Sequence, residues 1–365
     1  MKKHLLFIGN RFINNAPVQR YIMRSIKKKL ANINQINYFQ DSDNALFLVL
    51  DQLLKEDIKL VIITTKTSSA VVGKLLSTIT SDNQILNDNM LIPSRTTVFE
   101  KGSYLVEHEK AIVNVIIATE NQELPLIILE DEKKSAILHV FDEDAPGVKI
   151  LLEPLATSFD VKLDFTTIID GWIEVSVKSK KYGNISQFIN SAKQLLSHKL
   201  IATSNIIGYI IEKLSHNNKK ITFAESCSGG LLAYFFTKES GASNVFEGSL
   251  VTYSNILKSN WLAVDDEILE KNGAVSLEVV KEMSEGALNV SYADYALAIS
   301  GIAGPDGATD DKPVGTICLS ARSKYSEKHE KIQLFGDRNY IQEQSAFYAI
   351  KMLLLLDKEL FFKDL

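Results

Sequence analysis

The stretch ITFAESCSGG (residues 221–230) joins an apolar run to three side chains that carry a hydroxyl or thiol group, and then to a pair of glycines. The apolar run is typical of a short buried strand, and the glycines permit backbone conformations that other residues avoid, so we expect a strand-to-helix turn. A helix that begins there directs free N–H groups and its positive dipole end above the strand. Such a turn suits a phosphate or an oxyanion, but a turn of small residues that only packs is an equally good interpretation.

On both sides of this turn, residues 199–365 alternate between strand-like and helix-like patterns. Strands are expected at ITFAE, GSLVTYS, YALAISG, VGTICLSAR and EKIQLFG, and helices at IATSNIIGYIIEKL, LLAYFFTKE, SNILKSNWL, SLEVVKEMSEGALNVSY and NYIQEQSAFYAIKMLLLL. Ser276 is a suitable N-cap for the SLEVVKEMSEGALNVSY helix. The alternation predicts an α/β domain with helices on one or both faces of its sheet.

The rest of the chain divides into two further parts. Residues 1–146 alternate short apolar runs (4–8 and 59–65) with helix-like stretches (17–32 and 43–55), and this order predicts parallel strands joined by crossover helices. Further strands are expected at AIVNVIIAT, PLIILED and SAILHVFD, and the charged Pro-Gly stretch DEDAPGVK marks the expected boundary. The third part, residues 147–198, is typical of a small α+β module, with two strands within 159–179 and a helix over 185–198.

Composition and charge limit the possible classes of protein. The 365 residues are 45% hydrophobic and 23% charged, which is ordinary for a globular protein of two or three domains. The net charge of −5 does not favour nucleic-acid binding. Two cysteines, Cys227 and Cys318, provide neither a disulfide framework nor a thiol-rich metal site. No apolar run is long enough to span a membrane and the start MKKHLLFIGN reads as a strand, so we expect a cytoplasmic protein.

Ser226 and Cys227 are the two candidate nucleophiles in the quoted stretch. Because they are adjacent, their side chains point to opposite sides of an extended chain, and only one can face a pocket. No histidine is an evident base for either, since His216 and His329 lie in polar, loop-like sequence and are expected to be exposed. We therefore interpret Cys227 as a buried packing residue, with a thiol nucleophile as the alternative.

Lysine can replace histidine as the base when burial lowers its pKa. Lys258 lies in VTYSNILKSN, shortly after a strand end that also carries Tyr253 and Asn255. A Ser–Lys pair assisted by a tyrosine hydroxyl is chemically coherent. Most lysines of such a chain are solvated surface residues, so the spacing alone does not single out this one.

Two more stretches are rich in turn residues. ISGIAGPDG (residues 299–307) places Gly301, Gly304 and Gly307 after a strand, where backbone amides can approach a ligand, although a solvent-exposed turn explains the pattern equally well. Arg338 in FGDRNYIQ lies near the start of the last helix and can hold a phosphate with its forked donors. An ion pair of this arginine with Asp337 or Glu343 is an equally good interpretation.

Four of these stretches, TFAESCSGG, VTYSNILK, ISGIAGPDG followed by KPVGT, and FGDR, have an order and spacing that resembles the C-terminal domain of the CinA family, the nicotinamide-nucleotide amidases. The resemblance covers about residues 200–358. It implies hydrolysis of the amide of nicotinamide mononucleotide to nicotinate mononucleotide and ammonia, with no metal and no cofactor. It also implies that the protein is a homodimer and that it binds a small pyridine nucleotide.

The resemblance also implies a set of site residues. Ser226 matches the family's nucleophile, and Tyr253 and Lys258 match its catalytic tyrosine and lysine. The substrate-binding residues that it implies are Ser228, Gly229, Asn255, Gly301, Gly304 and Arg338. Two positions depart from the family pattern, since Ser228 replaces a common threonine and Gln342 replaces a frequent arginine, which weakens the expected grip on phosphate.

Full-length members of the family resemble molybdopterin-binding proteins over their first domain, which is followed by a KH-like module, and this layout fits residues 1–146 and 147–198. The family's first domain hydrolyses ADP-ribose with a divalent metal, using a Gly-Gly-Leu-Gly-Pro-Thr stretch and a nearby Asp pair. Here LVIITT is followed by KTSSAVVGK, which lacks both features. We therefore expect a scaffold without that activity. A metal-dependent ADP-ribose pyrophosphatase, or a non-enzymatic nucleotide-binding or regulatory protein, remain the alternatives.

Overall fold

The structure, a computed structural model, describes residues 1–30, 33–41, 43–130 and 135–363. It is a mixed α/β protein whose chain forms two compact units, residues 1–133 and 134–365, and each unit is described by itself. The sequence predicted three domains, with limits at 146/147 and 198/199. The second unit contains the last two of them, because residues 147–198 and 199–365 share one hydrophobic core.

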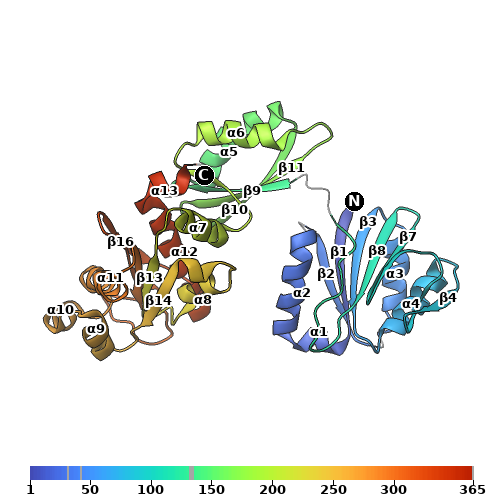
Figure 1. Cartoon of the computed structure of the whole chain (residues 1–365), viewed down its shortest axis with the longest axis horizontal. Coiled ribbons are helices and arrows are strands. Elements are labelled where there is room, and N and C mark those ends of the chain that lie inside the picture. Colours follow the sequence, from blue (N-terminus) through green and yellow to red (C-terminus); the bar gives the residue numbers. More distant parts are fainter. Residues whose placement is uncertain (31–32, 42, 131–134, 364–365) are drawn as a thin grey trace. The chain divides into compact units, whose positions relative to one another are not determined.

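The first unit is built on a six-stranded sheet in the order β2-β1-β3-β8-β7-β6, which Figure 1 shows in blue to green. Its strands are β1 (Lys2–Ile8), β2 (Gln35–Phe39), β3 (Ile58–Thr64), β6 (Thr96–Glu100), β7 (Ser103–His108) and β8 (Ala111–Ile117), and a separate hairpin joins β4 (Gln84–Asn87) to β5 (Met90–Pro93). The predicted strands β1 and β3 are parallel, as expected, and β2, which was not predicted, and β8 are parallel to them, whereas β6 and β7 are antiparallel additions. The expected strand PLIILED is wrong, since residues 125–130 form no strand, and residue 131 lies outside the described residues.

Helices cover both faces of this sheet. The helices are α1 (Asn10–Asn14), α2 (Ala16–Lys29), α3 (Leu46–Leu54) and α4 (Ser69–Ile79). Ile22 and Ile26 of α2 pack with Phe7 on one face, while the apolar side chains of α3 and α4 pack with Leu6 and Ile8 on the other. The alternation along β1 therefore buries both faces, as expected for a strand inside a parallel sheet.

The second unit begins with a four-stranded antiparallel sheet in the order β10-β11-β9-β12. The elements of this module are β9 (Ser135–Phe141), α5 (Ala145–Ser158), β10 (Val161–Ile169), β11 (Trp172–Ser179), α6 (Ile185–Leu195) and β12 (Leu200–Ala202). The strand SAILHVFD therefore belongs here, and not to the first domain as predicted. DEDAPGVK is the start of α5, where Asp144 accepts a hydrogen bond from the Gly147 N–H and Pro146 occupies the first turn.

The two faces of the module's sheet have different partners. One face packs on α5 and α6 through residues such as Val175 and Phe188. The other face packs on the end of the chain, where Trp172 lies edge-on to Phe347 with ring centroids 5.8 Å apart, and Phe141 lies edge-on to Phe362 at 5.7 Å. The module and the C-terminal domain therefore share one core.

The C-terminal domain is built on a five-stranded sheet in the order β14-β13-β15-β16-β17. Its strands are β13 (Ile221–Glu225), β14 (Phe246–Val251), β15 (Tyr295–Gly301), β16 (Thr316–Ser323) and β17 (Glu327–Gln333). Its helices are α7 (Ile206–His216), α8 (Leu231–Thr237), the short 3₁₀ helix η1 (Ala242–Asn244), α9 (Asn255–Leu262), α10 (Asp266–Asn272), α11 (Leu277–Ser291), α12 (Arg338–Leu356) and α13 (Lys358–Phe362). The predicted helix IATSNIIGYIIEKL is shorter than expected, because Leu200–Ala202 pairs with β9 and Asn205 caps α7.

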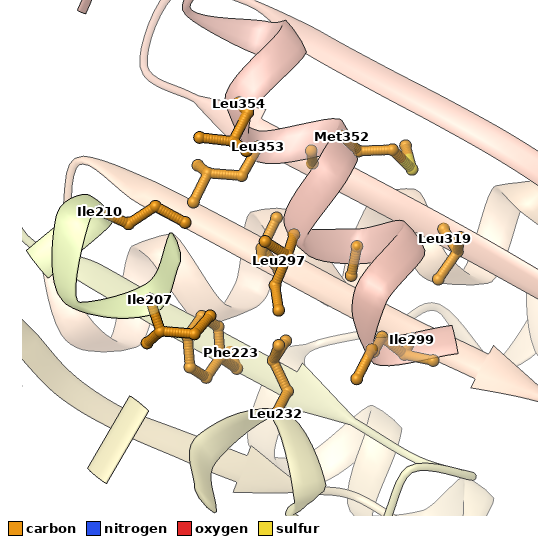
Figure 2. Close-up of a cluster of buried hydrophobic side chains, with 14 of the residues drawn as sticks. Ile207, Ile210, Phe223, Leu232, Leu297, Ile299, Leu319, Met352, Leu353 and Leu354 are labelled. Atoms are coloured by element: carbon orange, nitrogen blue, oxygen red, sulfur yellow. The ribbon is translucent and has the colours of Figure 1, made fainter. Parts of the chain in front are cut away.

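Helices cover both faces of this sheet, as one of the two expected arrangements predicts. Along β15, Leu297 and Ile299 point towards α7 and α12, where Figure 2 shows them among Phe223, Met352 and Leu353. The intervening small residues, Ala296 and Ala298, face α11 on the other side, where its side chains pack closely. Ser276 caps α11 as expected, since its hydroxyl accepts a hydrogen bond from the Val279 N–H.

Candidate active site

The turn after β13 is organised by the carboxylate of Glu225, the last residue of that strand. Glu225 is fully buried, and it accepts hydrogen bonds from the hydroxyls of Ser228 (2.8 Å) and Ser249 (2.9 Å). It also accepts hydrogen bonds from the backbone N–H groups of Gly230, Leu232 and Ala233, each at 3.0 Å. A buried carboxylate with this many donors fixes the turn that follows it.

This arrangement corrects one expectation from the sequence. The first N–H groups of α8 were expected to be free to bind a phosphate or an oxyanion. The carboxylate of Glu225 accepts hydrogen bonds from these groups and neutralises the positive end of the helix. A backbone donor to an oxyanion at this place must therefore come from the turn itself.

The side chains of Ser226 and Lys258 meet beside this turn. The amine Nζ of Lys258 lies 3.1 Å from Ser226 Oγ, and it donates to the backbone carbonyls of Thr252 (2.8 Å) and Tyr253 (3.3 Å). Lys258 is 1% exposed and Ser226 is 8% exposed. Burial lowers the pKa of Lys258, an effect that the nearby Cys227 partly opposes, and a neutral amine at this place can accept the proton of the serine.

Tyr253, Arg338 and the glycine loop meet at the rim of the same turn. Arg338 donates from Nη2 to the Tyr253 hydroxyl at 3.0 Å and from Nη1 to the Gly304 carbonyl at 2.7 Å. The expected pairing of the Tyr253 hydroxyl with Lys258 is therefore absent, since Lys258 contacts only the backbone carbonyl of that residue within the described part of the chain. Among the ion pairs of the described residues, Arg338 forms none with Asp337 or Glu343, and Asp337 instead caps α12.

The remaining predicted residues occupy different settings. Gly229 is exposed with a φ of 61°, and a Cβ atom built there meets nothing within 4 Å, so the space above it is open. Asn255 is exposed at the first position of α9. Gly301 is different, because a Cβ atom there would lie 3.2 Å from the Cys227 sulfur and against Ile317, so packing requires this glycine. Ser228 is buried and uses its hydroxyl on Glu225.

The side chain of Cys227 is buried in the core of the domain. It is 4% exposed and packs among residues of α12 and β15. Burial raises the pKa of its thiol to about 12, so the thiolate is not formed at neutral pH. The interpretation of Cys227 as a packing residue is confirmed.

The two histidines of this region were expected to be exposed. His216 is exposed at the end of α7, but His329 lies on β17, half-buried, with Nδ1 3.0 Å from the hydroxyl of Ser320. Ser320 is 1% exposed, so this pair does not offer a nucleophile to a substrate. A hollow of about 420 Å³ in this unit is lined by residues at the other end of the strands, among them Lys219 and Asp357, and does not include the turn.

In the first unit, the turn after β3 also carries hydroxyl groups. Ser68 and Thr65 donate to the carboxylate of Asp41, Thr65 at 3.4 Å, and the Asn10 N–H donates to the same carboxylate at 3.2 Å. The Ser68 hydrogen bond is the main cause that lowers the pKa of Asp41. Among the described residues, no group of three or more His, Cys, Asp or Glu side chains could hold a metal ion.

Two comparisons relate these features to known proteins. Residues 204–356 match the model of the CinA C-terminal domain. A CinA-like protein of Endomicrobium trichonymphae is 35% identical over 234 residues, which is 60% of this chain and 55% of that protein. A CinA-like protein of Fervidobacterium nodosum is 44% identical over 144 residues, or 40% of this chain and 35% of that protein. The chain therefore spans about half or less of the length of these curated relatives.

One solved structure is similar to part of the chain. The competence/damage inducible protein CihA of Agrobacterium tumefaciens is 35% identical, covers 42% of this chain and 93% of its own, and has a TM-score of 0.41. Among the described residues of the present chain, no helix is sufficiently long and apolar to cross a bilayer.

Proposed function

The chain belongs to the CinA family, and we propose that its C-terminal domain hydrolyses the amide of nicotinamide mononucleotide to nicotinate mononucleotide and ammonia. The observation that carries this proposal is the distance of 3.1 Å between the buried Lys258 amine and the Ser226 hydroxyl. A serine next to a lysine of lowered pKa is a known form of activated nucleophile. Hydrolysis of a primary amide needs such a pair and a donor for the oxyanion.

In the first half of the reaction, Ser226 Oγ attacks the amide carbon as Lys258 Nζ takes the hydroxyl proton. The new C–O bond produces a tetrahedral oxyanion, which the turn stabilises through backbone N–H groups. Lys258 then gives its proton to the amide nitrogen, the C–N bond breaks, and ammonia leaves. An acyl ester on Ser226 remains.

In the second half, water replaces the amine. Lys258, neutral again, takes a proton from water as its oxygen attacks the ester carbon. The second tetrahedral species breaks its bond to Ser226, which recovers the proton from Lys258. The carboxyl group of the product loses its remaining proton to solvent, and nicotinate mononucleotide leaves as the carboxylate.

The rim supports a negatively charged substrate. Arg338 is exposed and its guanidinium is held between Tyr253 and Gly304, where it can add a hydrogen bond to a phosphate or ribose oxygen. Gly229 leaves open space next to the serine. We propose that the pyridine ring lies over the turn and that the phosphate approaches Arg338.

The direct test measures ammonia released from nicotinamide mononucleotide by the full chain and by Ser226→Ala. Turnover by the full chain and its loss in Ser226→Ala are expected, whereas Ser68→Ala in the first unit is a matched control that should keep full activity. Absence of ammonia from the wild-type chain between about pH 6 and pH 10 contradicts the proposal. Release of ammonia that persists in Ser226→Ala contradicts the assignment of the nucleophile.

A further inference from the structure

We propose that Gln342 of α12 is a positioning residue that orients the backbone N–H of Ser228 as the oxyanion donor of this site. The inference rests on the proposed Ser226 chemistry, and it assigns the donor and the side chain that holds it. Gln342 is half-buried, and its Nε2 donates to the backbone carbonyl of Cys227 at 2.6 Å, across 115 residues of sequence.

The choice of donor follows from the hydrogen bonds of the turn. The N–H of Ser226 donates to the Ile299 carbonyl (2.9 Å), and the N–H of Gly229 donates back to the Ser226 carbonyl (3.1 Å). The N–H of Leu231 donates to the Ser228 carbonyl (3.1 Å), and the next N–H groups of α8 donate to the Glu225 carboxylate. Within the described part of the chain, no oxygen accepts from the N–H groups of Cys227 and Ser228.

The Cys227 N–H is the weaker candidate of these two. It belongs to the Ser226–Cys227 peptide, whose carbonyl accepts from the Gly229 N–H (3.1 Å), and among the described residues no side chain holds that peptide. The Ser228 N–H belongs to the next peptide, whose carbonyl Gln342 holds at 2.6 Å. The Ser228 N–H is therefore the donor that we assign.

The Gln342 hydrogen bond acts on the same peptide unit as this donor. The Cys227 carbonyl and the Ser228 N–H belong to one planar peptide, and in the trans form they point in opposite directions. A side chain that holds the carbonyl on one side therefore fixes the N–H on the other. A carbonyl can accept only from the amide nitrogen of glutamine, so the orientation of the Gln342 amide is determined.

The position of Gln342 makes it a rigid support. It lies in the first turns of α12, which Asp337 caps by accepting from the Tyr340 N–H at 2.8 Å. Its neighbour Ile341 is fully buried, and the later part of α12 packs on the sheet through the core of Figure 2. Preorganised donors of this kind act on the transition state and not on substrate binding.

The test compares three substitutions at Gln342 in the full chain. Gln342→Met keeps the length but removes the donor, and Gln342→Glu places an acceptor against the carbonyl. Both should lower kcat by about 10- to 100-fold with KM nearly unchanged, because a misdirected oxyanion donor affects only the transition state. Gln342→Arg, which restores N–H donors, should recover most of kcat, and Gln344→Met on the same helix is the matched control.

Two further readouts separate positioning from a loss of structure or of the base. The pH profile of the Met variant should keep the wild-type midpoint, since Lys258 is untouched, and its melting temperature should equal that of Gln344→Met. A change mainly in KM, a shifted midpoint, or a kcat equal to wild type in Gln342→Met overturns the proposal.

A second substrate separates this inference from the proposed function. p-Nitrophenyl acetate acylates an activated serine whatever its natural substrate, and the burst of nitrophenol reports the rate. If the wild-type chain releases no ammonia but shows a burst that Ser226→Ala abolishes, the amidase proposal fails while the burst in Gln342→Met still decides the inference. If Ser226 reacts with neither compound, there is no oxyanion to stabilise and the inference fails as well.

Discussion

The turn after β13 and the turn after β3 are built in a similar way and differ in one group. Each connects a buried parallel strand to a helix, and each gathers hydroxyl groups around a carboxylate, Glu225 in one unit and Asp41 in the other. In the turn after β13, a buried lysine also lies 3.1 Å from a serine that does not bond to the carboxylate. In the turn after β3, Ser68 and Thr65 donate to Asp41.

The difference separates two roles of a carboxylate in such turns. Glu225 holds the backbone of the turn and leaves Ser226 to Lys258, whereas Asp41 accepts directly from the hydroxyls. A hydroxyl that donates to a carboxylate is well satisfied but has no base of suitable pKa to activate it. The arrangement of partners, more than the presence of serines, therefore distinguishes a candidate nucleophile from a structural turn.

Of the substitutions in the two turns, Lys258→Met should have the largest effect on activity. The substitution removes the proposed proton acceptor, so we expect kcat for ammonia release to fall by about 10²- to 10⁴-fold. Ser68→Ala in the other turn should leave kcat within experimental error. Steady-state kinetics, with circular dichroism to check folding, measure both; a kcat of Lys258→Met near that of wild type would show that the lysine is not the base.

The activity should depend on pH through Lys258 and not through Asp41. In the proposed mechanism Ser226 needs a neutral amine. Because burial lowers the pKa of Lys258 below its ordinary value of 10.5, kcat/KM should rise with pH and level off below that value. Asp41, with a pKa lowered by the Ser68 hydrogen bond, stays ionised throughout. A profile of kcat/KM with its midpoint at or above 10.5 would contradict a buried base.

The lowered pKa of Lys258 should also make the free energy of unfolding depend on pH. The unfolded chain binds a proton at Lys258 more readily than the folded chain, because the folded pKa is lowered. The free energy of unfolding should therefore increase as pH rises from the folded pKa towards the unfolded one. Urea titrations of the wild-type chain and of Lys258→Met across this range should show a smaller slope in the variant.

The two carboxylates should differ in their contribution to stability. Glu225 is fully buried with donors on both oxygens, so Glu225→Gln should lower the free energy of unfolding of its unit by about 3 kcal/mol. Asp41→Asn, in a half-exposed turn, should cost about 1 kcal/mol in the other unit. Both tryptophans, Trp172 and Trp261, lie in the second unit, so their fluorescence reports its unfolding. Equal effects of the two substitutions would contradict the distinction.

The smallest effect is expected at Cys227. Its thiol is buried and its pKa is raised to about 12, so iodoacetamide at about pH 8 should not inactivate the chain. Cys227→Ala should keep kcat within about threefold of wild type, since the side chain only packs. Rapid inactivation that Cys227→Ala prevents would instead favour a thiol nucleophile.

The turn was predicted from its local sequence pattern, whereas the Ser–Lys pair was singled out by the resemblance of four motifs to the CinA family, since spacing alone did not distinguish Lys258 from other lysines. The role of Glu225 was not foreseen, since a carboxylate that ends a strand gives no sign that it will accept from N–H groups up to eight residues later. Gln342 meets Cys227 across 115 residues, and no periodicity encodes such a contact. His329 was misread because the charged pattern of an exposed edge strand resembles a loop.

The domain limits were harder to predict for a different reason. A Pro-Gly stretch with acidic residues is typical of a linker, but it is equally typical of a helix start with an Asp cap and an early proline. Hydrogen bonds between β9 and β11, which lie far apart in the sequence, decide between these interpretations. A strand can be assigned to a sheet only after its partners are known.

The shared core of the second unit affects how the chain can be divided for experiments. A fragment cut at residue 204, where the family match begins, would remove Trp172 and Phe141 and uncover Phe347 and Phe362 to solvent. Such an apolar surface favours aggregation. The shortest fragment that keeps every aromatic contact of this core begins before β9, so the small module travels with the domain that carries Ser226.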